Sequence, residues 1–405
     1  MREGSRAKGW AMHTRLRSTP DQSSASRVKV LWLCTPLESR YGVMNIIRGW
    51  ASRFDYDQFD VTLAFYSPNP EEVRRRLSNF PRLRVEFMPE LCSLRLLFVP
   101  ALRALLTRMQ RERYDIVHTV FVQSDILGTI AARLTGVPVV VSSVMGYLVV
   151  PLGGAVWKTP IYKAAYGIVR GKIDRVTAIT RTTGRQLVED FGVAADKIHV
   201  LYSGIDLTER PRPPRTSGSF LIGSVGQLIP QKGVETVVRA IPKIAQKIAN
   251  VRLVIAGEGP ERPRLERMAE SLGVTDHVEF IGFTEDVPAL MARLDAFVFS
   301  AFPTYDGLPR VILEAMLQRT PVVAARTDPI EEVVVEGETG WLYEPGDAEG
   351  LAVAVERIRA KGASAALIVE RAYQQVLKFS IEKEVEQLQK SYCILLNGKV
   401  GLPAA

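Results

Sequence analysis

Short apolar runs alternate with amphipathic segments along the first half of the chain. The runs at 28–34, 61–66, 115–120 and 137–142 are rich in valine, isoleucine and leucine, which is typical of strands buried on both faces. Between them, residues 101–113 carry apolar side chains at i, i+3, i+4 and i+7, a pattern that predicts an amphipathic helix. Alternating strands and helices indicate a parallel sheet covered on both faces, so the fold class is α/β.

The same alternation restarts after a proline-rich segment. Residues 206–219 read DLTERPRPPRTSGS, which is typical of a linker between domains. Five further strand-like runs follow, namely FLIGSVG, VRLVIAG, VEFIGF, AFVFS and PVVAA, with helical patterns between them. Two doubly wound domains joined in this way make a cleft, and ligands of such domains bind at the carboxyl ends of the strands.

These patterns divide the chain into five parts. We expect a disordered basic arm at 1–27, a Rossmann-like domain at 28–210, a linker at 211–219, a second Rossmann-like domain at 220–378 and a last helix at 379–397. That helix follows the expected N-cap Ser380 and carries an apolar stripe, which would suit packing back against the first domain.

Composition narrows the class of protein. With 405 residues, 47% hydrophobic and 24% charged, the chain has the make-up of a two-domain globular protein. The three cysteines Cys34, Cys92 and Cys393 are far apart and match no metal-ligand spacing, which indicates a reducing compartment. The arm lacks the apolar run of a secretory signal, and Met12 is an alternative start. We therefore expect a cytoplasmic location.

One uncharged stretch, residues 134–157, has the length of a membrane span. It contains two prolines and four glycines and opens with a β-branched run, so we favour a buried strand over a transmembrane helix. The net charge of +8 favours anionic partners, either nucleotides or lipid headgroups, although solubility alone would also explain it. No nucleic-acid-binding motif is present, so we expect no nucleic acid partner.

Two turns of the second half could bind an anion or a nucleotide. In SVGQLIPQKGVETVVRAI, Lys232 and Gly233 stand at the start of a helix, where a lysine and backbone N–H groups form an anion site; a solvated lysine is the alternative. In IAGEGP, Gly257 ends a strand, and an ordinary strand-to-helix turn would explain it equally well. The loop at 282–286, which contains Phe283, could receive a nucleotide base.

The segment YDGLPRVILEAM holds two carboxylates around a helix start. Gly307 permits a tight turn, and Pro309 suits the first helical position. Glu314 lies among apolar residues, and a buried carboxylate needs hydrogen-bond partners. Vicinal sugar hydroxyls would satisfy both of its oxygens; the alternative is a structural carboxylate that caps a neighbouring loop.

These motifs, in this order, resemble the retaining nucleotide-sugar glycosyltransferases of family 4, which have the GT-B fold of two facing Rossmann-like domains. The resemblance is specific over residues 220–350, through SVGQLIPQKG, IAGEGP, VEFIGF, YDGLPRVILEAM, TPVVAA and EGETGWLYEPGD. It is looser in the first half, through RYGVMNIIRGWA, the region 114–143, AIT and KIHVLYSGID. It implies transfer of a sugar from a UDP- or GDP-sugar to a hydroxyl acceptor, with the acceptor bound by the N-terminal domain.

The resemblance also implies roles for single residues. Glu314 would hold the ribose hydroxyls, Asp306 would face the donor sugar, and Lys232 would neutralise the diphosphate. The remaining expected donor contacts are Gly42, Gln227, Gly257, Phe283, Gly307, Leu308, Pro309 and Arg310. His118 is either an acceptor or sugar contact or a structural histidine.

The chain departs from the family pattern at three places. Asp306 replaces the usual glutamate, Gln227 replaces the usual arginine, and Val144–Gly146 replaces a segment that often contains histidine. We therefore expect Arg310 or Arg326 to supply the missing positive charge. In the mechanism usually proposed for such enzymes, the departing phosphate takes the acceptor proton, so no side-chain base is required. Fixed positive charge replaces a metal ion, and we expect no metal and no cofactor.

The sequence says least about the identity of the acceptor. Arg74–Arg76 and the segment LRLLFVPALRALLTRMQRER combine basic and apolar positions, as a helix facing anionic lipid would; a buried helix with arginines on its wet face is the alternative. We expect a lipid-linked or polysaccharide acceptor and peripheral contact with the inner membrane. Two other functions stay open: a nucleotide-sugar epimerase on the same fold, and a non-catalytic sugar-nucleotide-binding protein.

Overall fold

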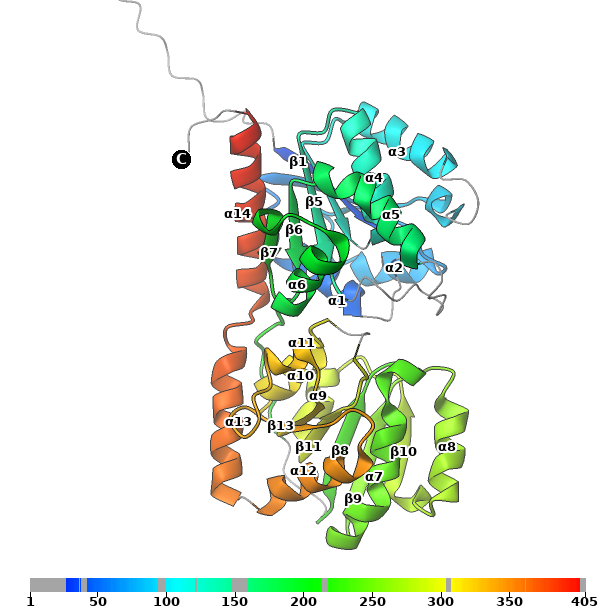
Figure 1. Cartoon of the computed structure of the whole chain (residues 1–405), viewed down its shortest axis with the longest axis vertical. Helices are drawn as coiled ribbons and strands as arrows, with labels where there is room; N and C mark the ends of the chain where they lie inside the picture. The colour runs from blue at the N-terminus through cyan, green and yellow to red at the C-terminus, as the bar shows by residue number, and fades with distance from the viewer. Residues whose placement is uncertain are drawn as a thin grey trace, which may run out of the picture.

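Two parallel-sheet domains lie one above the other in the computed structural model (Figure 1). The structure describes residues 27–35, 37, 42–93, 99–120, 122–146, 159–212, 218–303, 307–360 and 362–400. The arm at 1–26 and Met12 therefore lie outside the described residues.

The first domain contains a seven-stranded sheet in the order β3-β2-β1-β4-β5-β6-β7, and every neighbouring pair is parallel. Its strands are β1 (Val28–Cys34), β2 (Phe59–Phe65), β3 (Arg84–Phe87), β4 (Ile116–Val120), β5 (Val139–Val144), β6 (Arg175–Ala178) and β7 (Ile198–Val200). Its helices are α1 (Gly42–Arg53), α2 (Pro70–Leu77), α3 (Val99–Glu112), α4 (Val122–Leu134), α5 (Thr159–Val169) and α6 (Arg181–Phe191).

The second domain contains a six-stranded parallel sheet in the order β10-β9-β8-β11-β12-β13. Its strands are β8 (Phe220–Val225), β9 (Val251–Ala256), β10 (Val278–Gly282), β11 (Ala296–Phe299), β12 (Val322–Ala325) and β13 (Trp341–Tyr343). Its helices are α7 (Val234–Lys247), α8 (Arg262–Ser271), α9 (Val287–Arg293), α10 (Arg310–Leu317), α11 (Asp328–Glu331), α12 (Ala348–Ala360) and α13 (Gly362–Val376). The α/β prediction is confirmed.

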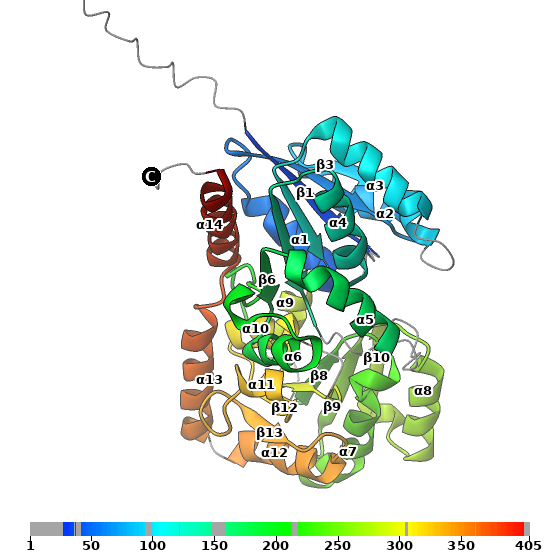
Figure 2. The ribbon, with the colours of Figure 1, turned by 45° about the horizontal axis from the view of Figure 1, so that its top comes forward.

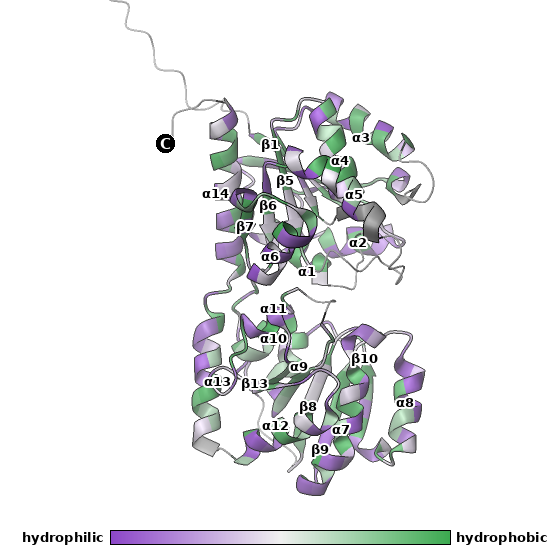
Figure 3. Ribbon diagram, viewed as in Figure 1, coloured by the Kyte–Doolittle hydropathy of each residue, from purple (hydrophilic) through white to green (hydrophobic). Residues whose placement is uncertain are grey.

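Each sheet separates two apolar cores, because the side chains of a buried strand alternate between its faces. In β1, Trp32 points into the core shared with α1, whereas Leu31 and Leu33 point into the core under α3 and α4. The helices that cover these cores carry alternating hydrophobic and hydrophilic segments (Figure 3). This double coverage explains why the central strands are continuous apolar runs.

The last helix, α14 (Ile381–Val400), leaves the second domain and packs on the first (Figures 1 and 2). Ser380 caps it, accepting a hydrogen bond from the Lys383 N–H at 3.2 Å. Ile381 and Tyr392 belong to the same core as Trp32, and the Trp32 indole donates to the Tyr392 hydroxyl at 3.2 Å. The final helix is thus part of the first domain's core.

The uncharged stretch at 134–157 contains β5, a buried strand, as expected. Residues 147–157 of that stretch lie outside the described residues. Within the part of the chain that the structure describes, no helix is long and apolar enough to cross a membrane.

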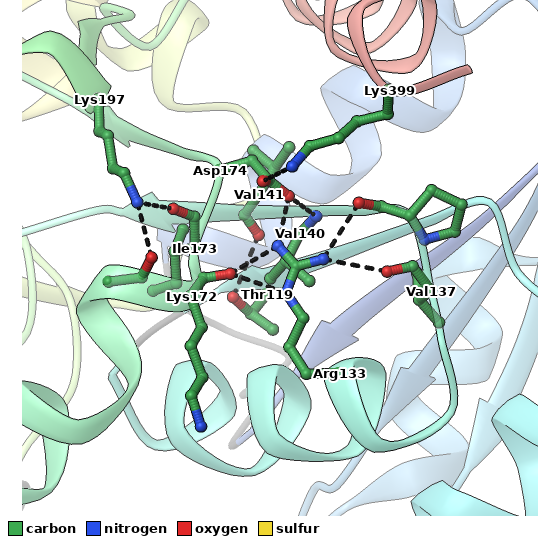
Figure 4. Close-up of polar contacts among 12 residues, drawn as sticks. Thr119, Arg133, Val137, Val140, Val141, Lys172, Ile173, Asp174, Lys197 and Lys399 are labelled. Carbon is green, nitrogen blue, oxygen red and sulfur yellow. Dashed lines mark hydrogen bonds and ion pairs between the residues drawn. The ribbon is translucent and has the colours of Figure 1, made fainter.

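A polar cluster at the amino ends of β5 and β6 fastens α4 and α14 to the first sheet (Figure 4). The Arg133 guanidinium donates to the Val137 and Lys172 carbonyls, at 3.0 and 2.6 Å, and to Asp174 at 2.5 Å. Lys399 reaches the same carboxylate at 3.0 Å. Burial alone would raise the pKa of Asp174, but the Val140 N–H and these two cations outweigh burial and lower it. Because the cluster lies at the edge opposite the strand carboxyl ends, we assign it a structural role.

Replacing Arg133 with alanine should destabilise the protein by about 2–4 kcal/mol, because it leaves a partly buried carboxylate and several carbonyls without their donor. Since the pKa of Asp174 is depressed in the fold, the cluster's contribution is present above the ordinary carboxyl pKa and is lost in acid. Urea unfolding at pH 7 measures the loss. Arg103→Ala, at an exposed position of α3, is the matched control and should change stability by less than about 0.5 kcal/mol; an equal effect of both would contradict the assignment.

Candidate functional site

The strand order of each sheet reverses at one point, between β1 and β4 in the first domain and between β8 and β11 in the second. Open parallel sheets bind ligands outside the strand ends at such points. The two edges approach each other here. A β-carbon placed on Gly307, after β11, would lie 2.7 Å from the Ile179 side chain and 3.2 Å from the Gly146 backbone of the first domain. Gly307 is therefore required for close contact between the domains.

The loops that follow β8, β9 and β10 are bonded to one another. The Gly226 N–H donates to the Ala256 carbonyl at 3.0 Å, and the Gly257 N–H donates to the Gly282 carbonyl at 2.7 Å. Gly257 has φ 149°, and a β-carbon there would lie 1.8 Å from the Gly226 oxygen. The structure thus brings together the expected donor contacts Gln227, Gly257 and Phe283 along one edge.

Lys232 lies between the ends of β8 and β11. The Ser300 hydroxyl donates to the Lys232 carbonyl at 2.8 Å, and the Phe302 N–H donates to the Gln231 carbonyl at 2.9 Å. Its ammonium group is 5.8 Å from the centre of the Phe299 ring, within range of a cation–π contact. Gly233 follows with φ 59° and is the N-cap residue of α7. A cation at a helix start and a sheet switch point is suited to bind phosphate.

Glu314 lies in the second turn of α10 and is half-buried. Burial raises the pKa of this carboxyl group, and the Arg310 charge opposes the rise. Among the residues that the structure describes, none donates a hydrogen bond to this carboxylate or forms an ion pair with it. The described residues thus offer no loop that this carboxylate caps.

Three expectations about charge need correction or stay open. The Arg310 guanidinium donates to the Ser203 hydroxyl at 3.3 Å and to the Gly204 carbonyl, so it faces the connection between the domains. Arg326 is paired with Glu331 and Glu344, so neither arginine is placed to compensate for Gln227. Asp306 lies outside the described residues.

His118 is a core residue, which agrees with the structural-histidine alternative and not with a contact to acceptor or sugar. It lies in the middle of β4, with no exposed surface. Its two ring nitrogens bond to Tyr392 and Ser143, and Trp50 stacks on its ring. Burial lowers its pKa to about 3, so the ring stays neutral.

Gly42 opens α1 at an exposed position, and a β-carbon added there would meet no atom within 4 Å. Leu308 and Pro309, which follow Gly307 and directly precede α10, are buried.

Within the described part of the chain, no group of three His, Cys, Asp or Glu residues could hold a metal ion.

The arginines of α2 do not form an unpaired basic patch. Arg74 pairs with Glu71, and Arg75 pairs with Glu72. Arg76 crosses to the second domain, where its guanidinium lies 5.6 Å from the Phe283 ring centre and 3.6 Å from Glu285. Sequence reasoning missed this contact, because nothing in the sequence indicates that α2 lies near the loop after β10. The contact places a cation from the first domain beside the expected base-binding loop.

The helix α3 fits the buried-helix alternative. Ala101, Leu105 and Met109 are buried against the first sheet, whereas Val99 is exposed. Arg108 is paired with Glu86. Residues 94–98, which open the basic and apolar segment, lie outside the described residues.

Family models cover both domains. The model described as "Glycosyl transferases group 1" matches residues 206–375, and the model described as "Glycosyltransferase Family 4" matches residues 41–209. The chain belongs to this glycosyltransferase family. The expectation from the sequence motifs is therefore confirmed for the family, and the fold of this family member is GT-B, as solved structures also indicate.

Curated relatives match parts of this family member. One is the lipopolysaccharide core biosynthesis glycosyltransferase LpsE of Rhizobium meliloti, 34% identical over 40% of this chain and 46% of its own length. Another is a GDP-mannose-dependent alpha-(1-6)-phosphatidylinositol monomannoside mannosyltransferase of Mycolicibacterium smegmatis, 32% identical over 48% of this chain and 56% of its own length. The chain thus spans about half the length of these relatives.

Solved structures match nearly the whole chain. Anabaena Alr3699/HepE, crystallised with UDP, has a TM-score of 0.73 and 21% identity, covering 90% of this chain and 99% of that one. Sucrose-phosphate synthase from Thermosynechococcus elongatus has a TM-score of 0.76 and 18% identity, covering 92% and 100%. At these identities the similarity establishes the fold.

Replacing Gly233 with alanine should destabilise the second domain by about 3–5 kcal/mol and abolish binding of UDP and GDP. The added β-carbon would lie 2.2 Å from the Ser300 carbonyl oxygen, so the Lys232 turn and the end of β11 cannot keep their positions. Urea unfolding and isothermal titration measure the two effects. Gly273→Ala is the matched control, because Gly273 has a similar φ of 65° with no atom within 4 Å of the β-carbon; it should cost about 1–2 kcal/mol and leave binding intact. Equal losses in both variants would argue against the close packing of this turn.

Proposed function

We propose that this protein transfers a sugar, with retention of configuration, from a UDP- or GDP-sugar to a hydroxyl group of a polysaccharide or glycolipid precursor. One observation carries the proposal: the half-buried Glu314 carboxylate has no hydrogen-bond partner in the described part of the chain and lies one turn into a helix at the switch point. The roles of the other donor-site residues are taken from the family's motifs, matched to this sequence residue by residue.

The ribose of the donor explains why Glu314 is tolerated. An unpaired carboxylate in apolar surroundings costs several kcal/mol, whereas two vicinal hydroxyls can donate to its two oxygens. Burial raises the pKa of this group, and a bound donor that supplies hydrogen bonds to the carboxylate should lower that pKa again. The site is therefore completed by its ligand.

The diphosphate is the proposed ligand of Lys232. Developing negative charge on the leaving group is stabilised by a fixed cation and by helix N-terminal N–H groups, and these cost no reorganisation during the reaction. Gln227 contributes hydrogen-bonding capacity without charge. Because Arg310 and Arg326 are engaged elsewhere, Lys232 carries most of this stabilisation among the described residues.

The acceptor proton needs no protein base in this proposal. The acceptor hydroxyl attacks the face from which the nucleotide departs, and an oxygen of the leaving phosphate takes its proton as the sugar–phosphate bond breaks. The burial of His118 agrees with this route, since its neutral ring is bonded inside the core. The role of Asp306 beside the donor sugar stays a prediction.

Relatives support the substrate classes without deciding between them. One relative's name states GDP-mannose dependence and a phosphatidylinositol mannoside acceptor, another's states lipopolysaccharide core synthesis, and a structural neighbour holds UDP. A lipid-linked acceptor would bring a cytoplasmic enzyme to the membrane surface, so peripheral contact is part of the proposal. The arginine pairs of α2 mean that this contact would rest on other residues.

A thermal-shift screen of UDP- and GDP-sugars should identify one donor that stabilises the protein, by about 2.7 kcal/mol at one hundred times its Kd. Glu314→Ala should weaken this donor roughly 10- to 100-fold, because two charge-assisted hydrogen bonds are lost. Glu270→Ala, an exposed position on α8, is the control and should keep wild-type affinity.

Turnover of the identified donor distinguishes the rival functions. Transfer to a hydroxyl acceptor, or slow release of nucleotide without one, agrees with the proposal. Conversion of the donor sugar without release of nucleotide would indicate an epimerase, and binding with no turnover would indicate a binding protein. Equal responses of the wild type and Glu314→Ala would remove the basis of the proposal.

A further inference from the structure

A second buried carboxylate, Glu384, lies where the chain crosses between the domains. The Trp50 indole donates to one of its oxygens at 2.8 Å, and the Gly204 N–H donates to the other at 2.6 Å. Glu384 belongs to α14, Trp50 belongs to α1, and Gly204 belongs to the segment that leads from the first domain to the second. One side chain thus joins three separate parts of the chain.

The two crossings of the chain are packed tightly at this point. The Ile205 N–H donates to the Phe379 carbonyl at 2.9 Å, and the Ile381 N–H donates to the Ile205 carbonyl at 3.0 Å. A β-carbon on Gly204 would lie 2.5 Å from the Ser380 carbonyl. The position of the Gly204 peptide is therefore fixed on one side by the second crossing and on the other by Glu384.

The far side of the same peptide holds the helix of the donor site. The Gly204 carbonyl accepts a hydrogen bond from Arg310, the first residue of α10, and the Ser203 hydroxyl accepts a second one at 3.3 Å. Arg310 and Glu314 are one helical turn apart, on the same face. The Arg310 charge acts on both carboxylates, lowering the pKa of each relative to what burial alone would give.

We propose that Glu384 is a positioning residue of the donor site, which acts through the Gly204 peptide and Arg310 to hold Glu314 where the ribose binds. The inference rests on the proposed function. It adds a residue from the last helix, outside both matched family segments, to the groups that set the geometry of the site. In its ionised form Glu384 accepts a hydrogen bond from the Trp50 indole on one oxygen and from the Gly204 N–H on the other. In the protonated form one oxygen carries a hydrogen, which faces one of these two N–H donors and weakens that hydrogen bond.

Titration of Glu384 supports a pH-dependent effect. Burial raises its pKa to about 7, against the opposing effects of the two N–H donors and Arg310. The neutral form therefore favours the fold, and this stabilisation is lost as the pH rises from about 4.5 to about 7. The ionised form, in contrast, holds Gly204. The titratable and charged groups of the surrounding elements are Arg310, the Arg53 that pairs with Glu382 and Asp206, and the neutral His118 behind Trp50.

Glu384→Gln tests the proposal, because the amide can accept from only one of the two donors. We expect its kcat at pH 8, measured as nucleotide release from UDP-glucose or GDP-mannose, to fall about tenfold. The Kd for UDP or GDP should rise about threefold to tenfold, because Glu314 no longer holds the ribose in a fixed position, and Tm at pH 8 should not fall, since a buried charge has been removed. Glu386→Gln, at an exposed position of the same helix, should match the wild type.

The pH profile and one indole resonance give readouts that a purely structural role would not move. The wild-type kcat should decrease from pH 8 to pH 6 with a midpoint near 7, and Glu384→Gln should be flat over this range. The Trp50 indole N–H signal, assigned with Trp50→Phe, should titrate with the same midpoint in the wild type and not in Glu384→Gln. Should Glu384→Gln fail to fold, agreement of the two wild-type midpoints supports the proposal and disagreement overturns it.

Other outcomes overturn the proposal directly. One is that Glu384→Gln has the wild-type kcat at pH 8 and the wild-type fall in kcat from pH 8 to pH 6. The other is that Glu384→Gln loses activity only to the extent that its Tm falls. If wild-type protein binds neither UDP nor GDP, the proposed function fails first, and this is visible before any change at Glu384 is made.

Discussion

Both sheets are parallel throughout, and a parallel sheet must be covered on both of its faces. In the first domain, the core around Trp32 is closed by α1 together with α14, the last helix of the chain. The chain must therefore cross from the first domain to the second and back. The two crossings meet at Ile205, and they carry the peptide that Arg310 of α10 contacts. The need to cover the first sheet with α14 thus places the peptide that Arg310, the first residue of α10 in the second domain, contacts.

The strands that were predictable from the sequence are those with at least four apolar residues, since burial on both faces leaves no polar alternation to confuse the pattern. Strands β3, β6, β7 and β13, which the patterns did not predict, have only two or three apolar residues each, too few for such a run to be recognised. Gln227, Gly257 and Phe283 follow three strands of one parallel sheet, so the alternation of elements already implies that they lie along one edge; that the three strands are neighbours comes from the structure. Family membership and the GT-B fold were likewise predictable from motifs.

The errors concern side chains whose partners are distant in sequence. The sequence left His118 open between a structural residue and an acceptor or sugar contact, and its partners from α14 and β5 place it in the core. Arg310 precedes Glu314 by one turn, so its position in the sequence suggests that it binds a phosphate. Its guanidinium instead donates to the backbone carbonyl of Gly204, which is distant in the sequence. Glu384 sits in an apparently polar stretch, EKEVEQ, and only the crossing of the chain buries it. Local pattern cannot reveal partners that the topology supplies.

The charge of the chain has a similar explanation. A net charge of +8 indicates a basic surface, yet the arginines of α2 and Arg326 are held by neighbouring carboxylates. Such surface pairs contribute little stability individually, but they reduce the local potential that would attract an anionic surface. Bulk charge is therefore a poor guide to where this protein meets an anion.

The use of the last helix in the first core also affects synthesis. Strand β7 ends at Val200 and α14 begins at Ile381. At ordinary translation rates, the residues between them take roughly ten to forty seconds to synthesise. Until then, α14 cannot cover the face of the first sheet around Trp32 and Phe54. During that interval the nascent chain exposes aromatic surface that a chaperone would bind. A ribosome that stalls late in the message would release a chain whose earliest-made domain is the incomplete one.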